Sequence, residues 1–256
     1  MRATLADGTR VHCMQPFEAR VIDRDIAGYF THGIAIAPGD TVLDLGANIG
    51  LFGLRASQRC GGDLALYCVE PIPQLCELLA RNLGSRATIV PWAIGASSGT
   101  VELEYFPLMA ATSGVTAVIP DDARWAELVE DTAHKKLGGL ARLVPRAVYA
   151  FISRRMRGLR QRVRCESGTI TQLIELHGLE RIALIKLDIE GAELAALQGV
   201  SEAHWPRIAQ IVAEIHDRRR DLAEITRLLE RHGFVVTIQE RDCVDDDCCN
   251  LYALRA

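Results

Sequence analysis

The chain has 256 residues, of which 49% are hydrophobic and 24% are charged, and its formal net charge is −4. This composition is typical of a soluble globular domain and excludes disordered and collagen-like chains. The mild negative charge argues against a surface built to bind nucleic acid. No run approaches the roughly 20 apolar residues that cross a bilayer, and the first 18 residues lack an export signal. We therefore expect one cytoplasmic domain over residues 1–256, with no transmembrane segment.

Short apolar runs bounded by turn residues predict the strands of a sheet. They cover residues 41–46, 64–69, 88–90, 183–188 and 208–215. Helical patterns cover residues 49–60, the segment carrying Leu75, Leu78, Leu79 and Leu83, and residues 192–200. Strands that alternate with helices predict a parallel sheet covered on both faces. The chain closes with a helix over 222–232 and strands over 234–238 and 250–254, which predict an antiparallel pair at one edge.

One stretch carries a strong excess of positive charge. Residues 132–164 contain no acidic residue and ten basic ones, namely Lys135, Lys136, Arg142, Arg146, Arg154, Arg155, Arg157, Arg160, Arg162 and Arg164. Its apolar residues have helical spacing, so we predict a helical insertion over residues 121–164 that covers the ligand-binding edge of the sheet. A solvated basic face, an acidic partner protein, an anionic substrate and a membrane surface all remain open as explanations.

The turn after the first strand predicts a nucleotide-type ligand. The chain there reads Asp44-Leu45-Gly46-Ala47-Asn48-Ile49-Gly50, and Glu70 closes the second strand. In open α/β sheets ligands bind at the carboxyl ends of the strands. Glycines let the backbone turn sharply there, and a carboxylate accepts both hydroxyls of a ribose. An adenosine-type cofactor is implied.

The details favour S-adenosylmethionine over NAD. The dinucleotide fingerprint is GxGxxG, whereas Asn48 occupies the position of the second glycine. None of the five tyrosines is followed four residues later by lysine, as a short-chain dehydrogenase would require. Asp44 suits a cationic ligand better than a pyrophosphate, and S-adenosylmethionine carries an ammonium and a sulfonium group.

The cysteines do not predict a metal centre. Cys243, Cys248 and Cys249 lie near three consecutive aspartates, but no CxxC pair is present. Adjacent Cys248 and Cys249 would point to opposite faces of a strand. We expect free thiols in a reducing compartment.

Four segments together resemble the FkbM family of methyltransferases, especially members that O-methylate polyketide natural products. They are residues 44–50, Val69-Glu70-Pro71, the KLDIEGAE run over 186–193, and Glu214-Ile215-His216. The resemblance implies a class I methyltransferase fold, which is a Rossmann-like, doubly wound, mostly parallel α/β sheet with an antiparallel edge strand. It also implies a pocket for S-adenosylmethionine. The positions that would line this pocket are Asp44, Gly46, Asn48, Gly50, Glu70, Pro71, Ile72, Trp92, Ala93 and Asp188.

Methyl transfer to an alcohol requires removal of the acceptor's proton. His216 titrates near neutral pH and is the expected general base, with Asp188 or Glu214 as its orienting partner. Glu190 is a further candidate, although Glu190 and Glu193 also suit the start of a helix.

Two alternative chemistries stay open. In the first, Asp188, Glu214 and Asp217 hold Mg²⁺, which lowers the pKa of the acceptor, a sugar or other small-molecule hydroxyl. In the second, the acceptor is an amine, although the Asn/Asp-Pro-Pro-aromatic motif of such enzymes is missing after residue 187. We expect a small-molecule hydroxyl as acceptor, presented by an acidic carrier protein if the basic insertion binds one.

Overall fold

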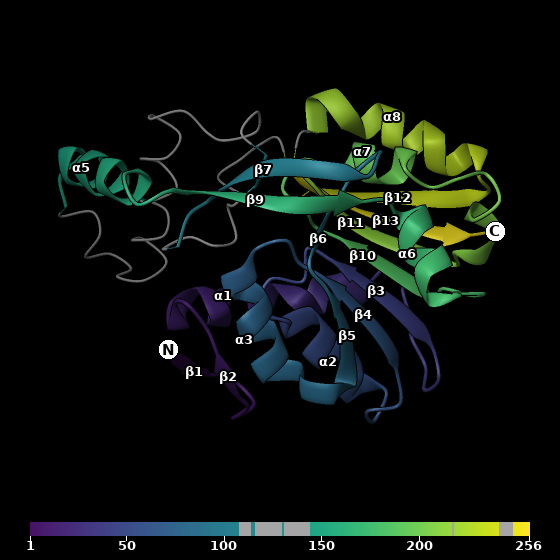
Figure 1. The fold of residues 1–256 in the computed structure, drawn as a ribbon, viewed down its shortest axis with the longest axis horizontal. Coiled ribbons are helices and arrows are strands. Elements are labelled where there is room, and N and C mark those ends of the chain that lie inside the picture. Colours follow the sequence, from purple (N-terminus) through teal and green to yellow (C-terminus); the bar gives the residue numbers. More distant parts are fainter. Residues whose placement is uncertain (108–113, 116–129, 131–143, 217, 241–247) are drawn as a thin grey trace.

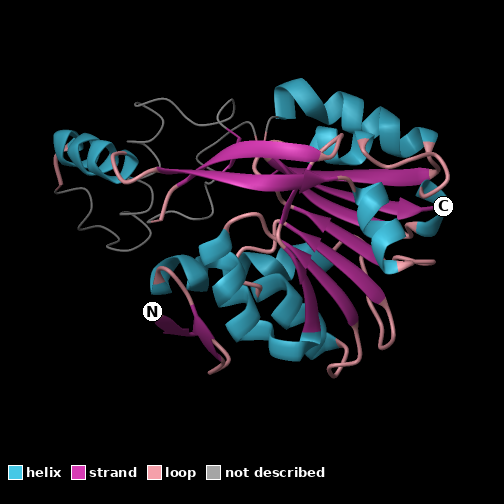
Figure 2. Ribbon diagram, viewed as in Figure 1, coloured by secondary structure: helices cyan, strands magenta, loops and turns pink. Residues whose placement is uncertain are grey.

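The computed structural model describes residues 1–107, 114–115, 130, 144–216, 218–240 and 248–256. Its centre is a seven-stranded sheet with helices packed on both faces (Figures 1 and 2). Across the sheet the strands are β12 (Phe234–Glu240), β13 (Cys249–Arg255), β11 (Gln210–Ile215), β10 (Leu184–Leu187), β3 (Thr41–Leu45), β4 (Ala65–Val69) and β5 (Ala87–Val90).

All neighbours from β11 to β5 pair in parallel, whereas β13 runs antiparallel to both β11 and β12. The predicted parallel sheet with an antiparallel pair at one edge is therefore confirmed. The strand order reverses between β3 and β10, which are parallel hydrogen-bonded neighbours although β4, β5, the second sheet and several of the described helices separate them in sequence. In open α/β sheets, ligands bind at the carboxyl ends of the strands where the strand order reverses, which here are the ends of β3 and β10.

Two apolar cores lie on opposite faces of the sheet. On one face pack α1 (Pro16–Asp25), α2 (Leu51–Arg59) and α3 (Pro73–Leu83). On the other pack α6 (Ile170–His177), α7 (Glu193–Gln198) and α8 (Arg218–Arg231). Adjacent strand residues such as Val42 and Leu43 enter different cores, because side chains alternate across a strand. Burial of the central strands on both faces explains why the predicted runs are mostly apolar.

The N-terminal elements lie outside the sequence prediction. An antiparallel pair, β1 (Arg2–Thr4) and β2 (Arg10–His12), precedes α1, and the 3-10 helix η1 (Ile26–Phe30) follows it. Two further 3-10 helices are η2 (Gly84–Arg86), after α3, and η6 (Trp205–Arg207), before β11. Among the helices that are described, none is long and apolar enough to cross a membrane.

A second sheet extends from the body of the molecule (Figure 1). Its order is β6 (Trp92–Ile94), β9 (Gln161–Gly168), β7 (Gly99–Tyr105) and β8 (Gly114–Val115). The helix α5 (Arg146–Arg157) lies beyond the outer end of β9. The expected helical insertion over 121–164 is thus helical in α5, while residues 116–129 and 131–143 lie outside the described residues.

The helical prediction is wrong for residues 161–164, which belong to β9. Inward-facing Val163 and Cys165 alternate with exposed Arg162, Arg164 and Glu166, and this is the period of a strand. Two of the basic residues also have internal acidic partners. Arg160 lies 3.3 Å from Glu104, and Arg162 lies 3.5 Å from Glu102.

Candidate active site

A buried ion pair between β10 and β3 holds the turn after β3 in place. Lys186, on β10, places Nζ 3.2 Å from Oδ1 of Asp44 and donates a hydrogen bond of 2.8 Å to the carbonyl of Gly46. Asp44 has no exposed surface. Burial raises the pKa of Asp44, while the ammonium of Lys186 opposes the shift. Asp44 therefore contacts the neighbouring strand, and the pair fixes the position of the glycine turn.

Both glycines of the turn are required by internal packing. Gly46 has φ +75°, and a Cβ there would lie 1.8 Å from the carbonyl oxygen of Asp188. Gly50 has φ +83°, and its Cβ would lie 2.5 Å from Leu79 on α3. Both glycines thus let the turn adopt positive φ, and Gly46 lets it approach the backbone at the end of β10 at a distance that no other residue permits. Asn48, between them, also has a left-handed φ of +51°.

Glu70 binds the same turn from the end of β4. Its two carboxylate oxygens accept hydrogen bonds of 2.9 Å from the backbone N–H groups of Asn48 and Ile72. Glu70 is buried, and burial raises its pKa to about 7 against the effect of these two hydrogen bonds. A buried carboxylate thus lies next to the glycine turn, where the sequence predicted one.

The other positions expected around an adenine ring lie at the start of α3 and on β6. Pro71 is partly exposed, whereas the Ile72 side chain is buried in the core shared with α2 and α3. Trp92 and Ala93 lie on β6, and the Trp92 ring packs so tightly on Gly168 that a Cβ there would lie 2.6 Å from it. Contact of these residues with adenine stays a prediction.

His216 is the centre of a cluster of four carboxylates, which come from the ends of β10 and β11 and the start of α7. Its Nδ1 lies 3.0 Å from Oε1 of Glu193. Its Nε2 lies 3.5 Å from Glu190, 3.6 Å from Glu214 and 3.8 Å from Asp188. The four residues predicted to carry the chemistry, Asp188, Glu190, Glu214 and His216, therefore meet at one point.

Glu193 is the carboxylate that fixes the ring of His216. It has no exposed surface, and its Oε1 also accepts hydrogen bonds from the backbone N–H of Gly191 at 3.0 Å and of Ile189 at 3.3 Å. The same carboxylate therefore caps the loop after β10 and binds the imidazole. Its other oxygen, Oε2, is buried and has no hydrogen-bond partner in the described part of the chain.

The cluster is rich in negative charge. Burial lowers the pKa of His216, but Glu190, Glu193 and Glu214 outweigh this effect and hold it well above the usual 6.5. Glu190, which has a left-handed φ of +53°, has its pKa raised to about 8, chiefly by burial. Perturbed pKa values of this kind cluster at functional sites.

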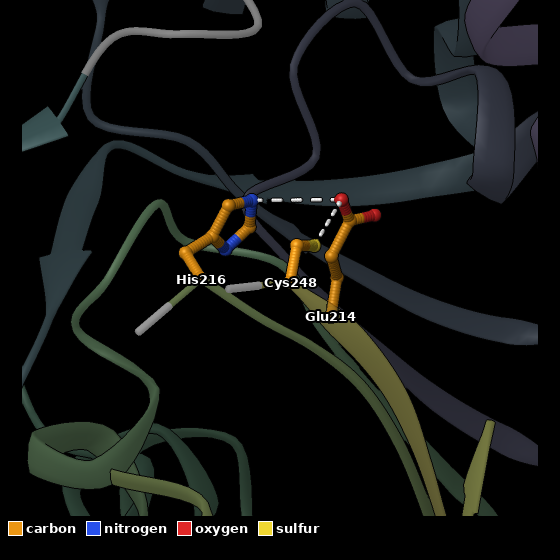
Figure 3. Close-up of side chains that lie close together, drawn as sticks. All are labelled: Glu214, His216 and Cys248. Atoms are coloured by element: carbon orange, nitrogen blue, oxygen red, sulfur yellow. Dashed lines mark hydrogen bonds and ion pairs between the residues drawn. The ribbon is translucent and has the colours of Figure 1, made fainter. Parts of the chain in front are cut away.

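Tyr29 and Cys248 also belong to this cluster, although the sequence predicted no role for Tyr29 and only a free thiol for Cys248. The Tyr29 hydroxyl, on η1, lies 3.1 Å from Oδ2 of Asp188 and 3.1 Å from Oε2 of Glu214. Cys248 places its Sγ 3.4 Å from Oε1 of Glu214 (Figure 3). Tyr29 is 159 and 185 residues from its two partners, so no local pattern could reveal the contact.

The donor set bears on the magnesium alternative. Asp188 and Glu214 do converge, but Asp217 lies outside the described residues. The imidazole of His216 and the thiol of Cys248 stand beside Glu214. Magnesium selects oxygen ligands and avoids nitrogen and sulfur, so these neighbours make the cluster a poor magnesium site.

Comparison with known proteins assigns the fold and the site to a family. The sequence model of the Methyltransferase FkbM domain matches residues 44–236, which run from the glycine turn through the His216 cluster to β12. The chain belongs to the FkbM family of methyltransferases. It is therefore an S-adenosylmethionine-dependent methyltransferase, and its seven-stranded sheet is the class I methyltransferase fold.

Three curated relatives illustrate the range of FkbM-family proteins. The chain is 30% identical to the 31-O-demethyl-FK506 methyltransferase FkbM of Streptomyces tacrolimicus, covering 92% of this chain and 89% of that one. It is also 30% identical to the methyltransferase sdnD of Sordaria araneosa, with coverages of 98% and 95%. The AMB antimetabolite synthetase AmbE of Pseudomonas aeruginosa is again 30% identical, but this chain spans only 12% of its length.

Proposed function

We propose that this FkbM-family enzyme transfers a methyl group to a hydroxyl oxygen of a polyketide or related natural product, with His216 as the general base. The observation that carries the proposal is the position of His216 Nε2. It lies among Asp188, Glu190 and Glu214 at the carboxyl ends of β10 and β11, beside the glycine turn. The name of the Streptomyces relative, a 31-O-demethyl-FK506 methyltransferase, supports oxygen as the acceptor atom.

The residues at the end of the sheet suit S-adenosylmethionine. When bound, it supplies a methyl group on a positively charged sulfur. Glu70, buried beside Asn48, would accept the ribose hydroxyls, and Gly46 and Gly50 shape the turn that would border the sugar and methionine. Asp188 is about one-quarter exposed and belongs to the acidic cluster, whose charge favours a cationic ligand. The donor set therefore fits a nucleoside that carries positive charge.

Glu193, in place of Asp188, is the proposed orienting partner of His216. With Glu193 as the hydrogen-bond acceptor, the proton of the neutral imidazole lies on Nδ1 and the lone pair of Nε2 faces the other carboxylates. Nε2 then takes the proton of the acceptor hydroxyl as the oxygen attacks the methyl carbon. The surrounding carboxylates stabilise the imidazolium that forms. A base positioned in this way contributes roughly 10²–10⁴-fold in rate.

The same charges set a condition on the base. His216 must lose its proton before it can accept one, and the carboxylates hold that proton tightly. Positive charge that enters beside Asp188 lowers the pKa of the imidazole, because it offsets the negative charge that raised it. Binding of the cationic donor thus prepares His216 for the acceptor.

The basic helix α5 is the proposed contact for an acidic carrier of the acceptor. Arg154 and Arg155 are exposed on it, and so is Phe151, at 65%. The synthetase AmbE contains a region similar to this chain within a much longer protein. Changing Arg154 and Arg155 to Glu should slow methylation of a carrier-bound acceptor and leave a free acceptor unaffected. If the variant methylates the carrier-bound acceptor as fast as the unaltered chain does, the proposed contact with a carrier is wrong.

Calorimetry with S-adenosylhomocysteine tests the donor site first. The chain is treated with EDTA and titrated with S-adenosylhomocysteine, with and without magnesium, and with NAD in parallel. We expect micromolar binding of S-adenosylhomocysteine alone, independent of magnesium. A second assay follows transfer of a labelled methyl group to hydroxylated and amine acceptors. Binding of NAD alone, or transfer only to amines, would overturn the proposal.

A further inference from the structure

Three side chains of different chemistry converge within the His216 cluster. They are the carboxylate of Glu214, the imidazole of His216 and the thiol of Cys248, and one donor atom from each lies within 4.8 Å of the other two. Glu214 and His216 come from β11 and the residue after it, whereas Cys248 immediately precedes β13 (Figure 3). The pairing of β11 with β13 in register, Ile215 opposite Cys249, brings them together.

We propose that these three residues form a zinc-binding site and that zinc bound there inhibits methyl transfer. Sulfur, nitrogen and oxygen together form the donor set that zinc accepts and that magnesium does not. Binding releases the protons of the Cys248 thiol and of the His216 Nε2 to solvent, and no electron transfer is involved.

The distances fit a tetrahedral ion. Zinc lies about 2.3 Å from sulfur and about 2.0–2.2 Å from nitrogen or oxygen, so ligand atoms are separated by roughly 3.6 Å for sulfur–oxygen and 3.4 Å for nitrogen–oxygen. Here Sγ of Cys248 lies 3.4 Å from Oε1 of Glu214, and that oxygen lies 3.6 Å from Nε2 of His216. Three protein ligands leave a fourth position for water.

The surroundings of His216 also match those of a zinc ligand. Metal-bound histidines almost always donate their second ring proton to a carboxylate or carbonyl, which fixes the tautomer. Glu193 provides this contact at Nδ1 and leaves Nε2 directed at Glu214. The second oxygen of Glu193 is buried without a hydrogen-bond partner among the described residues.

Inhibition is expected because zinc would bind the atom that acts as the base. Nε2 of His216 is the atom proposed to take the acceptor's proton, and its lone pair cannot accept that proton while it coordinates a metal ion. The binding part of this inference depends only on Glu214, His216 and Cys248. The inhibitory part rests on the function proposed above.

Cobalt and zinc titrations of the metal-free full chain test the binding part. Cobalt should give a thiolate charge-transfer band in the near ultraviolet, and zinc should displace it with one ion per chain. C248S should abolish the band and weaken zinc binding by about 100-fold or more, because even a residue that only supports a ligand accounts for about 10–100-fold. C165S is the matched control, since Cys165 bonds only weakly to Val101 on the second sheet, and it should behave like the unaltered chain.

If C248S fails to fold, the cobalt spectrum of the unaltered chain still tests whether a thiolate binds the metal ion. Absence of the thiolate band, or an unchanged band in a folded C248S, would overturn the site. For the inhibitory part, zinc should suppress methyl transfer by the unaltered chain and a chelator should restore it. C248S, with its rate in zinc compared with its own zinc-free rate, should resist inhibition by zinc. Stimulation by zinc, or equal inhibition of C248S, would overturn that part, while a chain inactive without metal would count against the proposed function and leave the titrations unaffected.

Discussion

Nδ1 of His216 and Oε1 of Glu193 lie 3.0 Å apart and connect the loop after β11 to the start of α7. Glu193 is fully buried and bound by two backbone N–H groups, so it holds the imidazole in one orientation. The other ring nitrogen then faces the three remaining carboxylates. This pair determines where a proton or a metal ion can be accepted in the site.

Replacement of His216 by Asn should lower kcat by about 10²–10⁴-fold, because the acceptor loses its general base. Affinity for S-adenosylhomocysteine, measured by calorimetry, should not change. H204N is the matched control, because His204 is buried and bonded to Ser201 away from the cluster. Full activity of H216N would show that another group takes the proton.

Replacement of Glu193 by Gln should lower the pKa of His216. The carboxylate raises that pKa by hydrogen bonding to the ring and by its charge, and the amide keeps the shape without the charge. NMR titration of the imidazole measures the shift, and kcat should fall while the KM for the donor stays constant. E175Q, on the exposed side of α6, serves as control. An unchanged imidazole pKa would leave Glu193 with a purely structural role.

Affinity for S-adenosylhomocysteine should fall as the pH drops below about 7. Burial raises the pKa of Glu70 to about 7, so below that pH the carboxyl carries a proton and accepts the ribose hydroxyls poorly. If binding needs the ionised form, affinity falls by up to about tenfold per pH unit. Calorimetry from pH 5.5 to 8.5 gives the profile. E70Q should bind weakly at every pH, and a pH dependence that persists in E70Q would assign it to another group.

Alanine at position 46 should destabilise the fold far more than alanine at position 39. Both glycines have positive φ, +75° and +83°, so both substitutions cost about 1–2 kcal/mol in backbone strain. At Gly39 a Cβ meets nothing within 4 Å, whereas at Gly46 it meets the Asp188 carbonyl at 1.8 Å. Overpacking of this kind adds about 1–3 kcal/mol. Urea unfolding compares the two, and equal losses would contradict the close approach.

Removal of the Lys186 charge alone should lower the free energy of unfolding more than removal of both charges of the ion pair. K186M leaves Asp44 buried without its partner, and breaking such a pair costs about 3–5 kcal/mol. The double variant D44N/K186M has no unpaired charge, so urea unfolding should show part of that stability restored. A double variant no more stable than K186M would indicate that the hydrogen bond from Lys186 to Gly46 matters more.

The sequence by itself determined where the central strands and helices lie along the chain. Strands such as β3 and β10 are buried on both faces and therefore stand out as apolar runs, and polar residues directly after them mark the ligand-binding edge. Asp188, Glu190, Glu214 and His216 could be named for this reason, because parallel strands end at the same edge of a sheet. The second sheet was not predicted, because the basic residues at the start of β9 were assigned to a helical insertion although their burial alternates as in a strand.

Only the tertiary structure decided which of these groups touch. Glu193 could be recognised as a helix-start residue, but its contact with His216 depends on how α7 packs beside β11. Tyr29 reaches Asp188 and Glu214 from an N-terminal turn, and Cys248 reaches Glu214 through the pairing of β13 with β11. These contacts join residues far apart in the chain. Local periodicity records only which face a side chain occupies, and the partner across that face is set by packing.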